Sequence, residues 1–521
     1  MAAMPVDPAG ESGEPEGRGG PGGPGATRPA TTRRERPLLD AYVAGVKRRG
    51  VAFTVPGHKG LVGALDDRLA IAVDADRPLY GGVDTVKLRD GLLAQPERLA
   101  AKHYEADWCR FSTGGSTHAN QTLCLAIGRP GDEVIVNRSL HRSLLLGLVL
   151  AGLSPRWLPT GVDAGSGMPI GTAVADLERA LEASPGARAV FLTEPGYLGT
   201  LSDLPRLVEV AHAAGVPVLV DQAWGAHFGY HPELPPHALA CGADALVTSI
   251  HKLLPGHSQA SLLAARLERF DLGRLERAFE ATHTTSPAGS ILASIDGALA
   301  LMEERGEELL TRVLDLVRSA RHELSEALPG IALPDAATFA ALGRDRFDDT
   351  RFVVRLGPLG ADGNEVERAM LEDHISLELA DRDTLLPIVT VADDEASLSN
   401  LVRSLVRAVG ATERGAPRPL VSAMSWRVDP VTAMNPAEAF YAHHERVPAE
   451  QAVGRVAAEL VAPYPPGIPV LAPGELVTRE LLDELRSVAA EGTRIAYAAD
   501  PTLDTLEVVA EGHVAAAPRP D

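Results

Sequence analysis

The stretch Ala245-Leu-Val-Thr-Ser-Ile-His-Lys252 runs from a short apolar segment into a serine, an imidazole and a lysine. Upstream, the segment Val216-Pro-Val-Leu-Val-Asp221 is also apolar and ends on a carboxylate. Short, uniformly apolar segments of this kind are typical of strands in a parallel sheet that is covered on both faces. In such sheets a ligand binds beyond the carboxyl ends of the strands, so we expect Asp221 and Lys252 in one site.

An aspartate and a lysine at the ends of two such strands are the groups that hold pyridoxal 5'-phosphate. A lysine condenses with the aldehyde of this cofactor as a Schiff base, and an aspartate keeps the pyridine nitrogen protonated so that the ring accepts electrons. For either residue alone, a surface lysine or a helix-capping aspartate is the better explanation. Together they predict a pyridoxal-phosphate enzyme with Lys252 and Asp221 as catalytic residues.

The chain divides by composition and pattern into four regions. The tail, residues 1–36, is rich in Gly, Pro and charge, and we expect it to be disordered. Residues 37–300 alternate apolar strands with helices, which predicts an α/β domain with a large, mostly parallel sheet covered by helices. A small α+β domain is expected at 301–414, and a C-terminal α+β domain at 415–521 follows a Pro-containing linker.

Individual elements are predicted from the same periodicities. The strands expected in the large sheet include 133–137, 189–193, 216–221 and 245–249, and a helix is expected at 204–213. A long helix at 291–316 leads into the small domain, where strands are expected at 350–356, 375–379 and 386–391 and helices at 364–373 and 395–409.

Bulk composition excludes several classes of protein. The 521 residues suffice for roughly three domains of ~100–200 residues. The formal charge of −21 argues against nucleic acid as a partner, because phosphate binding needs a basic face. Cys109, Cys124 and Cys241 have no metal-ligand spacing and are expected to be reduced thiols in a cytoplasmic protein. No apolar run approaches the ~20 residues that cross a bilayer, and no signal peptide follows Met1, so no membrane partner is expected.

A glycine-containing turn within Phe111–Gln121 feeds a helix and is the candidate phosphate site. Gly115 allows close backbone approach, while Ser116 and Thr117 offer hydroxyls and amide N–H groups at the helix N-terminus. Such a terminus binds a dianionic phosphate through hydrogen bonds and the helix dipole. An ordinary helix N-cap looks similar, so this signal alone is weak. Ser249 and His251 are expected to add phosphate contacts beside Lys252.

Other residues near strand ends are candidates for the same site. His141 offers a flat imidazole that can stack on one face of the pyridine ring, with the small Ala223 against the other face, although a lone histidine is more often a packed or surface residue. His227 either lines the site or caps the following loop. Tyr197 is expected to lie behind the residues that line the pocket.

Several motifs that carry other chemistry are absent. Gly57-His-Lys-Gly60 lacks the Walker spacing and the Ser or Thr after the lysine, so it does not predict a nucleotide loop. The chain has no HExxH, GxSxG or paired-Cys motif, and no metal site is predicted.

Taken together, these residues resemble the bacterial ornithine/lysine/arginine decarboxylases, which have the aspartate-aminotransferase-like fold of pyridoxal-phosphate fold type I. The matching segments are Phe53–Lys59, Gly115–Thr117 with Asn120-Gln121, Asn137–Ser143, Asp221–His227, Ser249–Lys252, Thr284–Pro287 with Ala293–Asp296, and Pro463–Glu475. The last segment contains Tyr-Pro-Pro-Gly-Ile-Pro and is more specific than the Ser-x-His-Lys box, which other pyridoxal enzymes share. The resemblance spans about residues 38 to 490.

This resemblance implies pyridoxal-phosphate-dependent decarboxylation of arginine, lysine or ornithine to the corresponding amine and CO2. It implies that Lys252 forms the Schiff base, that Asp221 lies at the ring nitrogen and that His141 stacks on the ring. The implied phosphate ligands are Ser116, Thr117, Ser249 and His251. The site is expected at a homodimer interface across which Thr285 and Ser286 are donated. The chain is similar to the shorter biosynthetic members, without the N-terminal receiver-like domain, so assembly beyond a dimer is left open.

The substrate and the reaction leave alternatives open. A cationic side chain needs an acidic partner, and Glu475, Glu378 and Asp84 are candidates by charge, although a solvated loop carboxylate is the better explanation for each. An aminotransferase or an aldolase/lyase would use the same aspartate, lysine and phosphate loop. A regulatory subunit derived from the family would be favoured by loss of Lys252 or Asp221, and both are present.

Overall fold

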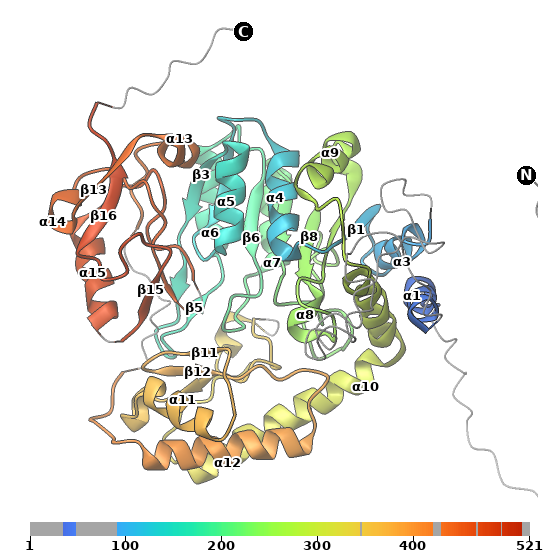
Figure 1. The fold of residues 1–521 in the computed structure, drawn as a ribbon, viewed down its shortest axis with the longest axis vertical. Coiled ribbons are helices and arrows are strands. Elements are labelled where there is room, and N and C mark those ends of the chain that lie inside the picture. The colour runs from blue at the N-terminus through green and yellow to red at the C-terminus, as the bar shows by residue number, and fades with distance from the viewer. Residues whose placement is uncertain are drawn as a thin grey trace, which may run out of the picture.

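A seven-stranded sheet, in the order β1-β9-β8-β7-β6-β2-β3, forms the centre of the computed structural model (Figure 1). The structure describes residues 35–47, 91–343, 346–419, 429–464, 467–490 and 492–512. The strands of this sheet are β1 (Trp108–Ser112), β2 (Glu133–Asn137), β3 (Ser154–Leu158), β6 (Val190–Thr193), β7 (Val218–Asp221), β8 (Ala245–Ser249) and β9 (Ser261–Ala265). Adjacent strands from β8 to β3 are parallel, and β9 is antiparallel to both β8 and β1. The connection from β8 to β9 is residues 250–260, with the short helix α8 (Ile250–Leu253), which is too little chain for a parallel crossover.

Helices cover both faces of the sheet, as the uniformly apolar strands predict. Successive residues of a strand point to opposite faces. Val190 and Leu192 pack into the core with α6 (Val174–Ala183) and α7 (Leu204–Ala213), whereas Phe191 packs into the core with α4 (Gly115–Ile127), α5 (Arg142–Ala151) and α9 (Leu272–Thr282). All residues of β7 and β8 are buried, so their polar side chains are held in place by close packing.

A 39-residue helix, α10 (Gly289–Ala327), runs from the large sheet to a small α+β module (Figure 1). This module holds the three-stranded sheet β10-β12-β11, made of β10 (Val354–Arg355), β12 (Thr384–Leu386) and β11 (Leu379–Ala380), with helices α11 (Gly363–Glu372) and α12 (Glu395–Ala411). At the other end of α10, Asp296 accepts hydrogen bonds from the N–H groups of Leu38 and Leu39, which fixes the start of α1 (Pro37–Lys47). Helix α3 (Ala94–His103) precedes β1.

The C-terminal part, residues 429–512, has a hydrophobic core of its own that includes Val461, Leu482 and Val508. Two antiparallel strand pairs and three short helices build it. They are β13 (His444–Pro448) with β16 (Thr505–Val509), β14 (Ala462–Tyr464) with β15 (Arg494–Ala496), and α13 (Pro436–Tyr441), α14 (Ala449–Ala452) and α15 (Arg479–Ala490). A further strand pair, β4 (Gly161–Val162) and β5 (Pro169–Ile170), follows β3.

The predicted elements of the large sheet are confirmed, but those of the small module are only partly correct. The helices expected at 364–373 and 395–409 are present, whereas the segment expected as a strand at 375–379 is paired only at its last residue. The strand expected at 386–391 instead ends at Leu386, because the next residue, Pro387, has no N–H for the ladder. The strand expected at 350–356 is reduced to two residues. The domain limits at residues 300 and 414 stay predictions, and one buried core extends from Leu38 to Val409 across the first of them.

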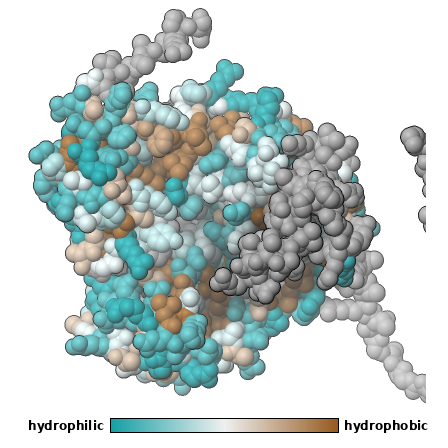
Figure 2. All heavy atoms as spheres, in the orientation of Figure 1, coloured by the Kyte–Doolittle hydropathy of each residue, from teal (hydrophilic) through white to brown (hydrophobic). Residues whose placement is uncertain are grey.

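The face shown in Figure 2 is mostly hydrophilic and carries a hydrophobic area over α5 and α13. Exposed apolar side chains of these two helices are Leu150, Phe440 and Tyr441. Among the described residues, no helix has the length and apolar character needed to cross a membrane.

Candidate active site

A pocket of about 670 Å³ opens at the carboxyl ends of β6, β7 and β8, facing the small module and the C-terminal part. The predicted residues that line it are Gly115, Ser116, Thr117, His141, Asp221, Ala223, Ser249, His251 and Lys252. The tertiary structure therefore brings together four segments that the sequence places up to about 140 positions apart. The pocket lies where the sequence predicts it, beyond the carboxyl ends of the parallel strands.

Lys252 lies on α8, immediately after β8, and its amine reaches the pocket. Its Nζ is 3.9 Å from the ring centroid of Trp224. Burial lowers the pKa of Lys252 to about 8, against the opposing effect of Asp221, and the positive charge of Arg351 lowers it further. A large fraction of this amine is therefore neutral near pH 8, which is the form that attacks an aldehyde.

Asp221 ends β7 and is buried, with both carboxylate oxygens engaged. Its Oδ2 accepts a 2.7 Å hydrogen bond from Asn120 Nδ2, and its Oδ1 accepts one of 3.1 Å from the N–H of Ala223. These donors fix the orientation of the carboxyl group at the end of the strand. Asn120 has no assigned role in the sequence analysis, although it lies one helical turn beyond Ser116 on α4, and this spacing points it to the same side of the helix.

His141 is the N-cap of α5 and belongs to a chain of hydrogen bonds that ends on Asp221. Its Nδ1 accepts from the N–H of Ser143, at 3.2 Å, and Ser143 Oγ lies 2.8 Å from the same nitrogen. Ser143 Oγ in turn accepts from Asn120 Nδ2, at 3.0 Å. The His141 ring is solvent-accessible in the pocket, but desolvation by the surrounding protein lowers its pKa, and Lys252 adds to this effect. A neutral, flat ring fixed in this way suits stacking on an aromatic cofactor.

One end of the pocket has the properties of a phosphate site. Helix α4 begins at Gly115, whose φ of +67° favours glycine, and its N-cap Gly114 has no side chain to accept from the N–H groups of the first turn. Ser116 Oγ and Ser249 Oγ are 2.7 Å apart, so the two hydroxyls form one polar cluster at this helix N-terminus. His251 Nδ1 donates to the carbonyl of Ala260, at 2.9 Å, which leaves Nε2 as its second polar atom. This end of the pocket fits a bound phosphate through hydroxyls, amides and the helix dipole.

The remaining wall of the pocket is lined from three parts of the chain. The large sheet contributes Tyr197 and Trp224, the small module contributes Glu378, and the C-terminal part contributes Tyr464, Ile468 and Tyr497. Tyr197 Oη donates a 2.7 Å hydrogen bond to Glu378 Oε1, and burial together with this carboxylate raises the pKa of Tyr197. The expectation that Tyr197 lies behind the lining is wrong, because its ring packs edge-on against Trp224 at the pocket wall.

Two predicted candidates lie outside the pocket. His227 is buried and bonds to Asp348, with Nε2 to Oδ1 at 3.1 Å, because its loop turns back toward the small module. Glu475 is neither a substrate ligand of this pocket nor a solvated carboxylate. It pairs with Arg138, at 2.9 Å, beside a second cavity between β3 and the C-terminal part, and its burial raises its pKa.

The remaining predictions are not decided by these contacts. Thr285 and Ser286 lie on an exposed loop after α9 and do not line the pocket of their own chain, so their donation to a partner subunit stays a prediction. Asp84 and the segment 53–60 lie outside the described residues. No cluster of His, Cys, Asp or Glu with the composition of a metal site occurs in the described part of the chain.

Comparison with known proteins identifies the family of this fold and pocket. Residues 36–357 match the family description "Orn/Lys/Arg decarboxylase, major domain", and residues 420–494 match "Orn/Lys/Arg decarboxylase, C-terminal domain". The chain is 32% identical to the arginine decarboxylase of Halalkalibacterium halodurans over 91% of this chain and 98% of the relative. It is 31% identical to the arginine decarboxylase of Bacillus subtilis over 92% and 98% of the two chains.

A solved structure has the same fold at lower sequence identity. The constitutive lysine decarboxylase of Escherichia coli superposes with a TM-score of 0.76 and 22% identity, covering 91% of this chain and 82% of that chain. The fold and the family descriptions define an amino-acid decarboxylase. The chain belongs to the Orn/Lys/Arg decarboxylase family, as its sequence resemblance predicts.

Proposed function

We propose that this protein decarboxylates L-arginine with pyridoxal 5'-phosphate as cofactor. The observation that carries the proposal is the Lys252 amine, with its pKa lowered to about 8, in one pocket with a buried Asp221 and the first turn of α4. Support for arginine, among the basic amino acids, comes from relatives with that name at 30–32% identity over at least 91% of this chain.

The cofactor fits the polar groups that the chain presents. Lys252 would hold the aldehyde carbon, Asp221 would hold a proton on the pyridine nitrogen, and His141 and Ala223 would contact the ring. Ser116, Thr117, Ser249 and His251 hold the phosphate at the N-terminus of α4. When bound, the pyridinium ring supplies a sink for the electron pair left by the departing carboxylate. The protein orients the substrate and excludes water from the reacting bond.

We assign recognition of the substrate side chain to the wall lined by Tyr197, Glu378 and Tyr497. Glu378 is the acidic residue of this wall, and it also contributes to the electrostatics at Lys252. Tyr464 and Tyr497 approach each other at Gly467, where a built Cβ would lie 3.3 Å and 3.4 Å from their rings. A flat guanidinium forms two parallel hydrogen bonds with a carboxylate and stacks on aromatic rings, which an ammonium does less well. One face of the Tyr497 ring already carries the Arg142 guanidinium, 4.1 Å from the ring centroid. A carboxylate beside aromatic rings nonetheless favours arginine over lysine and ornithine.

The proposal is tested with the full-length protein, pyridoxal phosphate and each of L-arginine, L-lysine and L-ornithine. CO2 and the amine product are measured together, with Lys252→Ala as the control. We expect kcat/KM for arginine to exceed that for the other two by at least about tenfold, equivalent to about 1.4 kcal/mol of discrimination. Preferred decarboxylation of lysine or ornithine would refute the substrate, and absence of CO2 from all three would refute the reaction.

We also propose a homodimer in which Thr285 and Ser286 reach the partner's pocket. The exposed position of this loop, which does not line its own pocket, supports the arrangement. If it is correct, mixing Lys252→Ala with an inactive Ser286→Arg variant restores about a quarter of the wild-type activity, because half the dimers are mixed and each holds one intact site. Failure to restore activity, with a dimer mass in light scattering, would refute the shared site.

A cytoplasmic location is the last element of the proposal. In the described part of the chain, Cys109, Cys124 and Cys241 form no disulfide, as expected in a reducing compartment. Fractionation of cells that produce the untagged protein tests it, and recovery outside the cytoplasmic fraction would contradict it.

A further inference from the structure

Trp224 contacts two cationic side chains at once. It follows Asp221 by three residues, is buried, and lines the pocket. On the pocket side, Lys252 Nζ lies 3.9 Å from its ring centroid. The guanidinium carbon of Arg351 lies 4.4 Å from the same centroid, although Arg351 does not line the pocket. The indole therefore contacts both the reactive lysine and a buried permanent cation.

Arg351 contacts the backbone of Trp224 as well as its indole ring. Arg351 Nη2 donates a 3.1 Å hydrogen bond to the carbonyl oxygen of Trp224. Room for the Arg351 side chain comes from Gly199, because a Cβ there would lie 2.4 Å from Arg351 Cγ, and the φ of Gly199 is +95°. The loop after β6, the loop after β7 and the start of the small module thus meet at one side chain.

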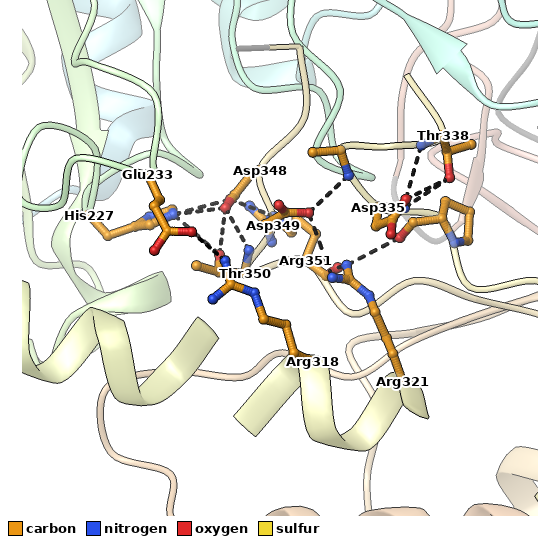
Figure 3. A network of polar contacts seen from close by, with 12 residues as sticks. His227, Glu233, Arg318, Arg321, Asp335, Thr338, Asp348, Asp349, Thr350 and Arg351 are labelled. Carbon is orange, nitrogen blue, oxygen red and sulfur yellow. Dashed lines mark hydrogen bonds and ion pairs between the residues drawn. The ribbon is translucent and has the colours of Figure 1, made fainter. Parts of the chain in front are cut away.

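A buried carboxylate anchors Arg351 from the other side (Figure 3). Asp348 is fully buried and lies 3.5 Å from Arg351 Nε. It also accepts hydrogen bonds from His227, at 3.1 Å, and from Thr350 Oγ1, at 2.7 Å. Although burial alone would raise it, the pKa of Asp348 is lowered to about 2 by His227 and Arg351, so this carboxylate is charged throughout the neutral range. Since His227 and Trp224 belong to one loop, residues 348–351 hold that loop at two points.

This arrangement is costly for a purely structural contact. Arg351 is 1% exposed, and its Nη1 has no hydrogen-bond acceptor among the described residues. Burying a guanidinium with incomplete pairing costs free energy, and a well-packed apolar side chain often serves stability as well or better. Because stability alone does not account for this buried charge, and because Arg351 contacts the same indole as Lys252, we look for its role at the pocket.

We propose that Arg351 is a positioning residue for Lys252 that acts through Trp224. Its guanidinium holds the indole against the lysine amine, and its charge, fixed by Asp348, favours the neutral amine. The role rests on the proposed function of Lys252 as the residue that binds the cofactor aldehyde, and it extends that function to a side chain outside the pocket lining.

Charged and titratable groups face Lys252 from several elements. Asp221 at the end of β7 and Glu378 before β11 favour the protonated amine, whereas Arg351 favours the neutral amine. His141, the N-cap of α5, and His251, next to Lys252 in the chain, both have pKa values lowered by burial and further by Lys252. Both imidazoles therefore favour the neutral form. Arg351 is therefore the permanent positive charge in this set, and its removal shifts the balance toward protonated lysine.

The test measures Lys252 itself in the cofactor-free, full-length protein. The rate at which acetic anhydride labels Lys252 is followed by peptide mass spectrometry from pH 6 to pH 10 in wild type, Arg351→Met and Arg351→Lys. We expect the labelling midpoint of Arg351→Met to rise by about one pH unit, so that labelling at pH 7 slows about tenfold. Arg351→Lys keeps the charge and should stay within about threefold of wild type at pH 7.

Arg355→Met is the matched control for a general loosening of the small module. Arg355 is also fully buried, donates to the carbonyl oxygen of Ser166 at 3.1 Å, and lies on β10 away from the pocket lining. Its loss should leave the Lys252 labelling midpoint unchanged. If Arg355→Met shifts the midpoint as much as Arg351→Met does, or if folded Arg351→Met keeps the wild-type midpoint, the proposal is overturned.

A second variant covers the case in which Arg351→Met does not fold, as judged by loss of a cooperative thermal transition. Trp224→Leu removes the ring that links the two cations while leaving both charges in place. We expect its midpoint to move in the same upward direction, since renewed access of water to the lysine amine outweighs the loss of the ring's attraction for the ammonium form. An unchanged midpoint in Trp224→Leu refutes the role of the indole. None of these readouts requires cofactor, so a failure of wild type to bind pyridoxal phosphate is recorded separately by the absence of Schiff-base absorbance.

Discussion

At the phosphate end of the pocket, the lining comes from α4 and the β8–α8 junction, both on the large sheet, whereas the substrate end joins Tyr197, Glu378 and Tyr497 from three separate parts of the chain. The first end is built by short local segments in which a glycine turn or a strand end is followed at once by a helix. The second depends on how the small module and the C-terminal part pack against the sheet. The comparison teaches that the sheet places the residues proposed to bind the cofactor, whereas packing between the parts places those proposed to select the substrate.

Asp221→Asn should produce the largest effect among changes at the sheet-built end. An amide cannot balance a proton on the pyridine nitrogen, so we expect kcat to fall by about three orders of magnitude, on the scale seen when the carboxylate that orients a catalytic base is replaced. Decarboxylase assays with saturating cofactor measure it. Asp203→Asn, at the N-cap of α7, is the control. Activity of Asp221→Asn within tenfold of wild type would contradict the assignment.

Glu378→Gln tests the end built by packing. Loss of a charge-assisted hydrogen bond worth about 1.5–3 kcal/mol should raise KM for arginine by about 10- to 100-fold. Cofactor affinity, measured by absorbance titration, should change little. Glu372→Gln, an exposed residue at the end of α11, serves as the control. A loss of cofactor affinity with an unchanged KM would place Glu378 at the wrong end of the pocket.

The pH dependence of cofactor uptake reports on Lys252. Because the neutral amine attacks the aldehyde and its pKa lies at about 8, the rate of Schiff-base formation should fall about tenfold per pH unit below 8 and level off above it. Stopped-flow absorbance on the cofactor-free protein gives this profile. A plateau that begins only near the ordinary lysine pKa would show that the pocket does not desolvate this amine.

Ser116→Ala should give the smallest effect of this series. One hydroxyl is lost from the pair that Ser116 forms with Ser249, and a net hydrogen bond of about 1 kcal/mol corresponds to about fivefold weaker cofactor binding. KM for arginine at saturating cofactor should remain unchanged. A rise in KM would contradict the division of the pocket into a part that binds cofactor and a part that binds substrate.

The elements of the large sheet were predictable because their signals are local. Fully apolar strands such as β7 and β8, and the glycine turn before α4, keep their character whatever else packs nearby. The small module was less predictable because its strands have two or three residues and are set by neighbours. At Ile375–Leu379, the apolar alternation predicts a strand, but the segment follows a turn at His374 with φ of +60°, and pairing begins only at Leu379.

The sequence by itself determined the groups that we propose bind the cofactor, since Asp221, Lys252 and the α4 N-terminus are each encoded by a local strand or helix signal. Parallel strands then bring their ends together. Only the tertiary structure decided the neighbours of those groups. It paired Tyr197 with Glu378, set Arg351 against Trp224, and placed His227 and Glu475 in buried polar contacts with Asp348 and Arg138 outside the pocket. The physical reason is that such contacts join residues more than a hundred positions apart, so they depend on the packing of whole elements and leave no pattern in either segment alone.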